Sequence, residues 1–393
     1  MKVFLIPPPE LPIPAVKGGA VETLVTHLLE ENEVQGKLEL VSASIPDPEA
    51  QAQARNYTHS RVLYLPRPED TLSIKIRRVI RRLKGCPPSI DPWYFAVEKA
   101  VKQEQPDFII AEGGNLNEPA LICRRMGRER SLFHLHGETT GSPHLAQYYG
   151  GGLILSDYVK RVFLEGCPIP AGKARILPNC IDLNRFSPVS PALREEKRAE
   201  LGYTPEDFVV IFCGRIAPDK GIHQLLEAML EIPDPSIKLL IVGSPFFGAA
   251  ATDPFMQSLK EKGLALGNRI QFTGYLPNQL LREYYGAADL SCVPSLCQEA
   301  AGLVAIEAMA CGLPVAATRS GGMPEYLAGS ESVLVEQGEG LVSRLAQAIT
   351  QLKADPERRA RMSALGPETA RRYGRPAFYE TFVSHLEEFQ KEC

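Results

Sequence analysis

Short runs of apolar, mostly β-branched residues alternate with longer amphipathic segments along nearly the whole chain. Continuous apolar runs of this kind are typical of strands buried on both faces, and the segments between them, such as GGAVETLVTHLLEE, KGIHQLLEAMLEI and GLVAIEAMACG, favour helices. The pattern therefore predicts an α/β fold of two doubly wound, Rossmann-like domains. The two series of runs are Val3–Ile6, Leu38–Ser42, Val62–Leu65, Phe108–Ala111, Leu132–Leu135, Leu153–Leu155 and Arg175–Leu177, then Phe208–Phe212, Lys238–Val242, Arg269–Phe272, Leu290–Val293 and Pro314–Thr318.

We expect the hinge between the domains in the proline-containing, charged stretch LPNCIDLNRFSPVSPALREEKRAELG. We expect a first domain over residues 1–186, a second over 187–372 and a C-terminal helix over 373–393. One side of that helix is apolar, and its spacing would let it pack back across the first domain. The apolar side carries Phe378, Phe382, Leu386 and Phe389.

Composition narrows the class of protein. The chain of 393 residues has 47 acidic and 43 basic side chains, a formal net charge of −4, which argues against a nucleic-acid binder. No stretch approaches the ~20 apolar residues that span a bilayer, and MKVFLIPPPELP suits a first strand better than a signal peptide. Nine cysteines without a repeated short spacing indicate reduced thiols, so we expect a cytoplasmic protein.

Two cations lie on the loop FCGRIAPDKG, which follows the strand Phe208–Phe212. Ligands of open parallel sheets bind beyond the carboxyl ends of the strands, where such loops enter helices. Gly214 lets the chain turn, and Arg215 and Lys220 together with a helix amino terminus suit a diphosphate. Taken alone, the two cations are better explained as solvated surface charges.

The loop and helix SLCQEAAGLVAIEAMACGLPV carry two glutamates. Glu299 precedes the helix, and Glu307 lies within it among small apolar residues, where vicinal ribose hydroxyls would satisfy its carboxylate. The small residues around Gly302 and Leu303 would let a phosphate approach the free amides of the first turn. A surface glutamate paired with a neighbour is the alternative for Glu307.

These motifs, in this order with SGGMPEYL after them, resemble the C-terminal half of family 4 retaining glycosyltransferases, which have the GT-B fold of two domains facing a cleft. Seven residues separate the two glutamates, as in that family. The N-terminal half also matches, since ELPIPAVKGGAVE resembles the family's glycine-rich loop and LPNCID its Pro-Asn-x-x-Asp stretch. With IVGSPFFG, the chain looks closest to the spore-coat and capsule-polysaccharide branch.

The resemblance implies a role for each matching residue of the second domain. Arg215 and Lys220 would hold the donor diphosphate and stabilise the charge that grows on it, a task that elsewhere falls to a divalent ion. Glu299 would face the donor sugar and Glu307 the ribose, while amides near Gly302 and Leu303 would contact the phosphates. The resemblance implies no metal and no cofactor.

In the first domain, Gly18 and Gly19 would let the glycine-rich loop approach the diphosphate. His136 in FHLHGE matches the family's histidine at a strand end beside the sugar. It would orient the donor sugar by a hydrogen bond, with general-base catalysis as a second possible role. His134, two positions back, is expected inside the sheet layers.

The segment TLSIKIRRVIRRLKG has six basic side chains, all within residues 72–84, and no acidic one. Drawn as a helix it has an apolar stripe and a basic remainder, which suits an anionic membrane surface at the inner face of the membrane. A domain helix whose stripe meets its own sheet, with its cations in water, explains the pattern equally well.

The leading hypothesis is transfer of a hexose from a nucleotide-diphosphate sugar, a UDP-sugar favoured, to a hydroxyl of a glycan or lipid-linked glycan in cell-surface, capsule or spore-coat polysaccharide synthesis. A sugar-nucleotide epimerase and a non-catalytic spore-coat or scaffold protein are the competing hypotheses. An NAD dehydrogenase is disfavoured because no G-x-G-x-x-G follows the first strand.

Overall fold

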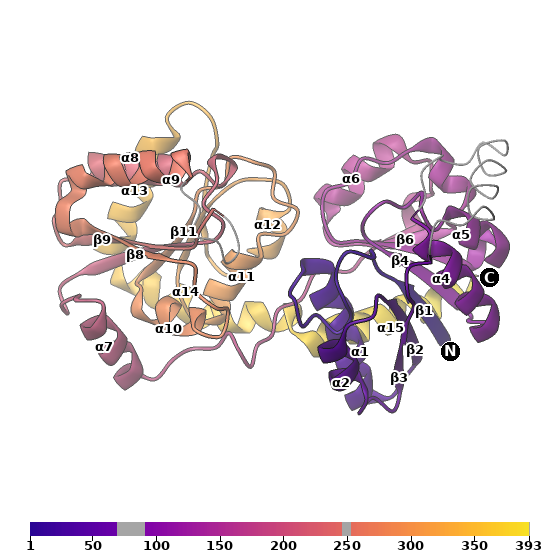
Figure 1. Ribbon diagram of the computed structural model, residues 1–393. Coiled ribbons are helices and arrows are strands. Elements are labelled where there is room, and N and C mark those ends of the chain that lie inside the picture. Colours follow the sequence, from indigo (N-terminus) through magenta and orange to yellow (C-terminus); the bar gives the residue numbers. More distant parts are fainter. Residues whose placement is uncertain (69–90, 246–252, 393) are drawn as a thin grey trace. The chain divides into compact units, whose positions relative to one another are not determined.

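The computed structural model describes residues 1–68, 91–245 and 253–392, and the chain divides into two compact units (Figure 1). The first unit consists of Met1–Cys180 and Arg375–Cys393, and the second of Ile181–Gly374. The units thus divide slightly before residue 186, where the sequence analysis places the hinge.

The first unit is built on a seven-stranded parallel sheet with the strand order β3-β2-β1-β4-β5-β6-β7. β1 is an inner strand between β2 and β4, and the chain runs to the β3 edge before crossing to the other side of β1, as in doubly wound folds. Helices connect successive strands because parallel neighbours need a crossover. The strands are β1 (Lys2–Ile6), β2 (Glu39–Ser44), β3 (Ser60–Tyr64), β4 (Phe108–Glu112), β5 (Ser131–Leu135), β6 (Gly151–Ile154) and β7 (Ala174–Ile176). The helices are α1 (Ala20–Gln35), α2 (Pro48–Ala54), α4 (Trp93–Glu104), α5 (Ala120–Met126), α6 (Asp157–Gly166) and α15 (Arg375–Lys391).

The second unit has a six-stranded parallel sheet with the order β10-β9-β8-β11-β12-β13. The prediction of two Rossmann-like domains is therefore confirmed, although the sequence analysis missed the short edge strand β13. The strands are β8 (Phe208–Cys213), β9 (Ile237–Val242), β10 (Ile270–Gly274), β11 (Leu290–Val293), β12 (Val315–Thr318) and β13 (Val333–Val335). The helices are α7 (Pro191–Glu200), α8 (Ile222–Glu231), α9 (Pro254–Gly263), α10 (Leu281–Ala287), α11 (Leu303–Ala310), α12 (Met323–Tyr326), α13 (Leu341–Ala354) and α14 (Pro356–Ala370).

The C-terminal helix α15 belongs to the first unit, where it packs against α1. Its apolar side is the predicted one, and all four predicted side chains are buried in the core of this unit. A polar contact supplements the packing, because the Tyr379 hydroxyl donates to Asn32 of α1. The Asn32 amide, itself fully buried, also donates to the carbonyl oxygens of Leu38 and His59 at 3.0 and 3.1 Å. Through Asn32, these hydrogen bonds connect α15 to the residues that directly precede β2 and β3.

Residues 72–84, the predicted basic helix, lie outside the described residues. Among the helices that are described, none combines the length and the apolar character needed to cross a membrane.

Replacing Phe382 with alanine should destabilise the first unit by about 3–5 kcal/mol, because the fully buried ring would leave a cavity between α15 and the sheet. Trp93 is the only tryptophan of the chain and is buried in the same unit, so urea unfolding followed by its fluorescence measures this change. Glu387→Ala, on the exposed side of α15, is the control. A loss no larger than that of the control would contradict the packing role of the helix.

Candidate functional site

The loops that follow β8 and β11 are in direct contact. Gly221 has a φ of +67°, and a Cβ there would collide with the carbonyl oxygen of Pro294, so glycine alone permits the approach. The amides of Leu296 and Cys297 donate to the carbonyl oxygen of Asp219 at 2.8 and 3.1 Å. These contacts fix the end of the first predicted motif against the start of the second.

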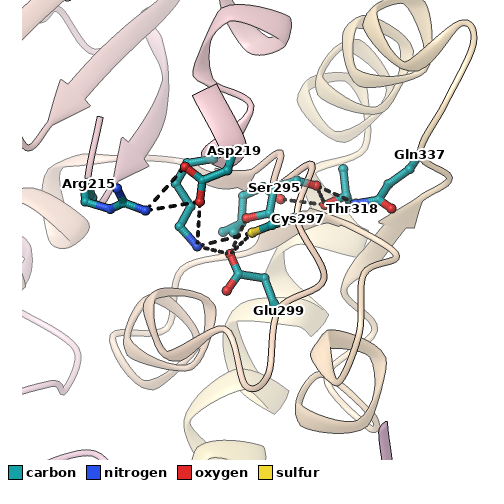
Figure 2. A network of polar contacts seen from close by, with 9 residues as sticks. Arg215, Asp219, Ser295, Cys297, Glu299, Thr318 and Gln337 are labelled. Atoms are coloured by element: carbon teal, nitrogen blue, oxygen red, sulfur yellow. Dashed lines mark hydrogen bonds and ion pairs between the residues drawn. The ribbon is translucent and has the colours of Figure 1, made fainter. Parts of the chain in front are cut away.

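Lys220 and Glu299 form an ion pair across this contact. The ammonium Nζ lies 2.7 Å from Glu299 Oε1, and the hydroxyl of the buried Ser295 donates to the same oxygen at 2.6 Å. Cys297 Sγ lies 3.5 Å from Nζ, and Figure 2 shows Cys297 and Glu299 close together. Burial alone would lower the pKa of Lys220, but the Glu299 carboxylate outweighs it and raises that pKa. Lys220 therefore carries its charge at neutral pH.

Arg215 is the more exposed of the two cations, with half of its side-chain surface open to solvent. Its guanidinium faces Asp219, whose carboxylate oxygens lie 3.2 and 3.4 Å from Nη2 (Figure 2). Because Asp219 Oδ2 is also 3.9 Å from Lys220 Nζ, one carboxylate lies near both predicted cations.

The loop that carries Glu299 is held in place by the last residue of β12 and by a residue that follows β13. Thr318 Oγ1 and Gln337 Nε2 donate to the carbonyl oxygen of Ser295 at 2.7 and 2.8 Å (Figure 2). At the third predicted loop, the Gly322 amide donates to the Glu299 carbonyl oxygen at 2.7 Å, and a Cβ at Gly321 would collide with that oxygen. SGGMPEYL therefore supports the Glu299 loop through its backbone.

Glu307 lines a cavity of about 240 Å³ beyond the carboxyl ends of β8 and β9. Its carboxylate accepts a hydrogen bond from the buried Tyr285 hydroxyl at 3.2 Å. Burial raises the pKa of Glu307 to about 7, although Tyr285 and the charge of Arg185 act in the opposite direction. The cavity is further lined by Arg215, Gly243, Ser244, Tyr275 and Asn278.

Two predicted glycines, Gly214 and Gly302, have positive φ angles on the backbone near Glu307. Gly214 has a φ of +144°, and its carbonyl oxygen packs so closely on Gly243 that a Cβ there would collide with it. Gly302, with a φ of +76°, is the N-cap of α11, whose first residue is Leu303. No described side chain caps this helix end, which suits the predicted phosphate contact at its amides.

In the first unit, His136 follows β5 and belongs to a buried cluster with His134 and Glu112. Glu112 Oε2 lies 2.8 Å from His134 Nδ1 and 2.8 Å from His136 Nε2. His134 is fully buried within the sheet, as expected, and the side chain of His136 is only 3% exposed. The sequence analysis missed Glu112, the last residue of a buried strand.

The predicted glycine-rich loop follows β1, so it also lies beyond the carboxyl ends of the strands. Gly18 and Gly19 have φ of +78° and +97°, and Gly19 is the N-cap of α1. A Cβ at Gly19 would collide with the carboxylate of Glu22, which is buried and electrostatically coupled to His136. The two glycines and His136 are therefore brought together within this unit.

Metal binding has one candidate among the described residues, because Glu112, His134 and His136 offer three ligand atoms within 4.8 Å of one another. Histidines that bind metals usually donate their second ring nitrogen to a carboxylate or carbonyl. Here His134 Nε2 and His136 Nδ1 are buried without a hydrogen-bond partner in the described part of the chain. The cluster thus lacks the outer hydrogen bonds of a metal centre.

Comparisons with known proteins agree with the motifs. Residues 194–369 match the family model described as glycosyl transferases group 1. The chain is 32% identical over 240 residues to a D-inositol 3-phosphate glycosyltransferase of Corynebacterium jeikeium, covering 60% of this chain and 57% of that protein. It is 33% identical over 198 residues to a GDP-mannose-dependent monoacylated alpha-(1-6)-phosphatidylinositol monomannoside mannosyltransferase of Corynebacterium glutamicum, covering 48% and 49%. The chain thus spans about half the length of the curated relatives it matches.

Solved structures extend the likeness to the whole fold. Anabaena HepE in complex with UDP has a TM-score of 0.76 at 22% identity and covers 99% of this chain and 100% of that one. A glycosyltransferase from Rickettsia africae has a TM-score of 0.78 at 17% identity, covering 100% and 99%. Residues 194–369 are thus similar to glycosyl transferases of group 1, and the chain as a whole has the GT-B fold of the solved structures.

Proposed function

We propose that this protein is a retaining glycosyltransferase that moves a hexose from a nucleotide-diphosphate sugar to a hydroxyl of a glycan or lipid-linked glycan. The observation that carries the proposal is the position of Arg215 and Lys220 on one short loop, with Arg215 and Glu307 lining one cavity. A nucleoside diphosphate needs both features, cations for its phosphates and a hydroxyl acceptor for its ribose.

Lys220 would bind the diphosphate without leaving Glu299. An ammonium has three N–H donors, and one is used by Glu299 Oε1. The remaining donors, with the half-exposed guanidinium of Arg215, would stabilise the charge that develops on the leaving diphosphate. Both cations are held by acidic neighbours before a ligand arrives, so little reorganisation is needed when the bond breaks.

Glu299 would orient the donor sugar. Its polar contacts from Lys220 and Ser295 both go to Oε1, which leaves Oε2 able to accept from a sugar hydroxyl. Retention would follow from attack on the same face of the sugar through an oxocarbenium-like state, as the resemblance implies. Glu307 would accept hydrogen bonds from the ribose, and amides at Gly302 and Leu303 would contact the phosphates.

The comparisons with known proteins bear on the base of the donor and on the type of acceptor. UDP in the HepE structure supports a UDP-sugar, whereas the mannosyltransferase relative is named for GDP-mannose, so both donors belong in the test. One relative is named for a phosphatidylinositol monomannoside, which supports a lipid-linked acceptor. A role in cell-surface polysaccharide synthesis stays a prediction from the sequence. A capsule or spore-coat role, a cytoplasmic location and membrane contact through residues 72–84 stay predictions from the sequence.

Calorimetric titration with UDP, GDP and ADP in EDTA tests the donor site directly. We expect one of them to bind, and Lys220→Met or Arg215→Ala to weaken that binding about 10-fold or more, because each removes a charge-assisted hydrogen bond. Lys262→Met is the matched control, since Lys262 also forms an ion pair, with Glu227 at 2.7 Å, on the outside of the same unit.

The three nucleotides also separate the competing hypotheses. If none of them binds, the proposed function is overturned and a scaffold role replaces it. If one binds but the corresponding nucleotide sugar is epimerised in the absence of an acceptor, the protein is an epimerase. Hexose transfer to a glycan acceptor is the result that we expect.

Donor affinity should rise with pH between about 6 and 8 and then level off. The pKa of Glu307 is about 7, and only the ionised carboxylate can accept hydrogen bonds from both ribose hydroxyls. Titration with UDP-glucose checks this, because its phosphate diesters do not titrate in this range. The Glu307→Gln variant should bind more weakly and show a flat profile. An unchanged pH dependence in that variant would show that another group is responsible.

A further inference from the structure

Two histidines share one carboxylate oxygen at the carboxyl ends of the strands of the first sheet. Glu112 is the last residue of β4, and the register places it beside His134 of β5. His136 follows two residues later, and its ring lies 3.9 Å from that of His134, centre to centre. Both rings approach Glu112 Oε2 at 2.8 Å, which is a normal hydrogen-bond distance.

The charge state of this cluster follows from its burial and hydrogen bonds. Burial alone would raise the pKa of Glu112, but the two histidines outweigh it and lower that pKa to about 2. Burial lowers the pKa of His134 to about 4. At neutral pH the carboxylate is therefore ionised and His134 is neutral, with Nδ1–H as the donor to Glu112.

The same acceptor selects the protonated nitrogen of His136. Because Glu112 Oε2 can only accept, the hydrogen bond requires a proton on His136 Nε2. In a neutral ring, Nδ1 is then an acceptor, and it is buried without a partner among the described residues. A protonated ring would instead bury an unpaired N–H donor at that atom, which is costly.

We infer that Glu112 is a positioning residue, which fixes the orientation and the Nε2–H tautomer of His136 so that Nδ1 accepts a hydrogen bond from a hydroxyl of the donor sugar. This role rests on the proposed function. With this tautomer, His136 would orient the sugar and would not donate a proton from Nδ1. His134 contributes indirectly, because its hydrogen bond to the same oxygen holds the carboxylate in place.

Nuclear magnetic resonance of ¹⁵N-labelled histidine measures the tautomer without any need for activity. In the wild-type protein, we expect the neutral form of the His136 ring to carry its proton at Nε2, with its signals identified by their loss in His136→Gln. In Glu112→Met, which replaces the acceptor with an apolar side chain of similar length, the signals should shift to a mixture of tautomers. Glu112→Gln keeps a carbonyl acceptor and should retain much of the wild-type tautomer.

Steady-state transfer assays test the consequence. We expect Glu112→Met to lower kcat about 10- to 100-fold, the size of effect known for the outer hydrogen-bond partners of metal-bound histidines, with a smaller change in the KM for the donor. Glu112→Gln should recover most of kcat. Urea unfolding followed by the fluorescence of Trp93, which is buried in the same unit as Glu112, controls for the folding of each variant.

Three results would overturn the positioning role. These are protonation of His136 at Nδ1 in the wild type, an Nε2–H tautomer that survives in Glu112→Met, and one equivalent of tightly bound metal at the cluster. Failure of the proposed function looks different. If the tautomers behave as expected but the wild type transfers no sugar, the transferase assignment falls and the role of Glu112 in sugar orientation falls with it.

Discussion

The contact between the loops after β8 and β11 is the constraint on which the candidate site depends. Lys220 and Glu299 are 79 residues apart in sequence, and they meet because Gly221 lies directly against the Pro294 carbonyl while two amides bind the Asp219 carbonyl. Any side chain at Gly221 would separate the loops and with them the ion pair. The chemistry of the second unit is therefore set by a backbone contact that only glycine allows.

The same contact explains why the cations are stable before a ligand arrives. Arg215 and Lys220 lie on one short loop, and without acidic neighbours they would repel each other. Asp219 lies between them in space, and Glu299 holds Lys220 from the other side. A diphosphate would then add to a partly neutralised pair, so binding depends on fixed donor directions as much as on net positive charge.

The strands are predicted well from the sequence because they leave local signals, and the candidate site residues stand out for the same reason, although their roles stay predictions. Apolar runs mark the buried strands, and glycines and charges mark the loops after them. The edge strand β13 is missed because Val333–Val335 is short and flanked by polar residues. Glu112, Ser295 and Asp219 are missed for a different reason, since their partners are set by strand register or loop contact. Only the observation that Glu112 ends a buried strand could have singled it out.

The two units use one carboxylate oxygen in the same way. In the second unit, Glu299 Oε1 accepts from Lys220 and Ser295, and in the first, Glu112 Oε2 accepts from His134 and His136. Two donors on one oxygen fix the carboxylate and, through it, the direction of each donor group. What each cluster presents to a ligand then differs. The Glu299 cluster offers the Lys220 ammonium with unused donors. In the Glu112 cluster, Nδ1 of His136 can only accept when Nε2 carries the proton. Each unit thus supplies, by itself, one polar group whose direction is fixed by a carboxylate oxygen with two donors, and the difference in charge between the two groups comes from the donors and not from the carboxylate.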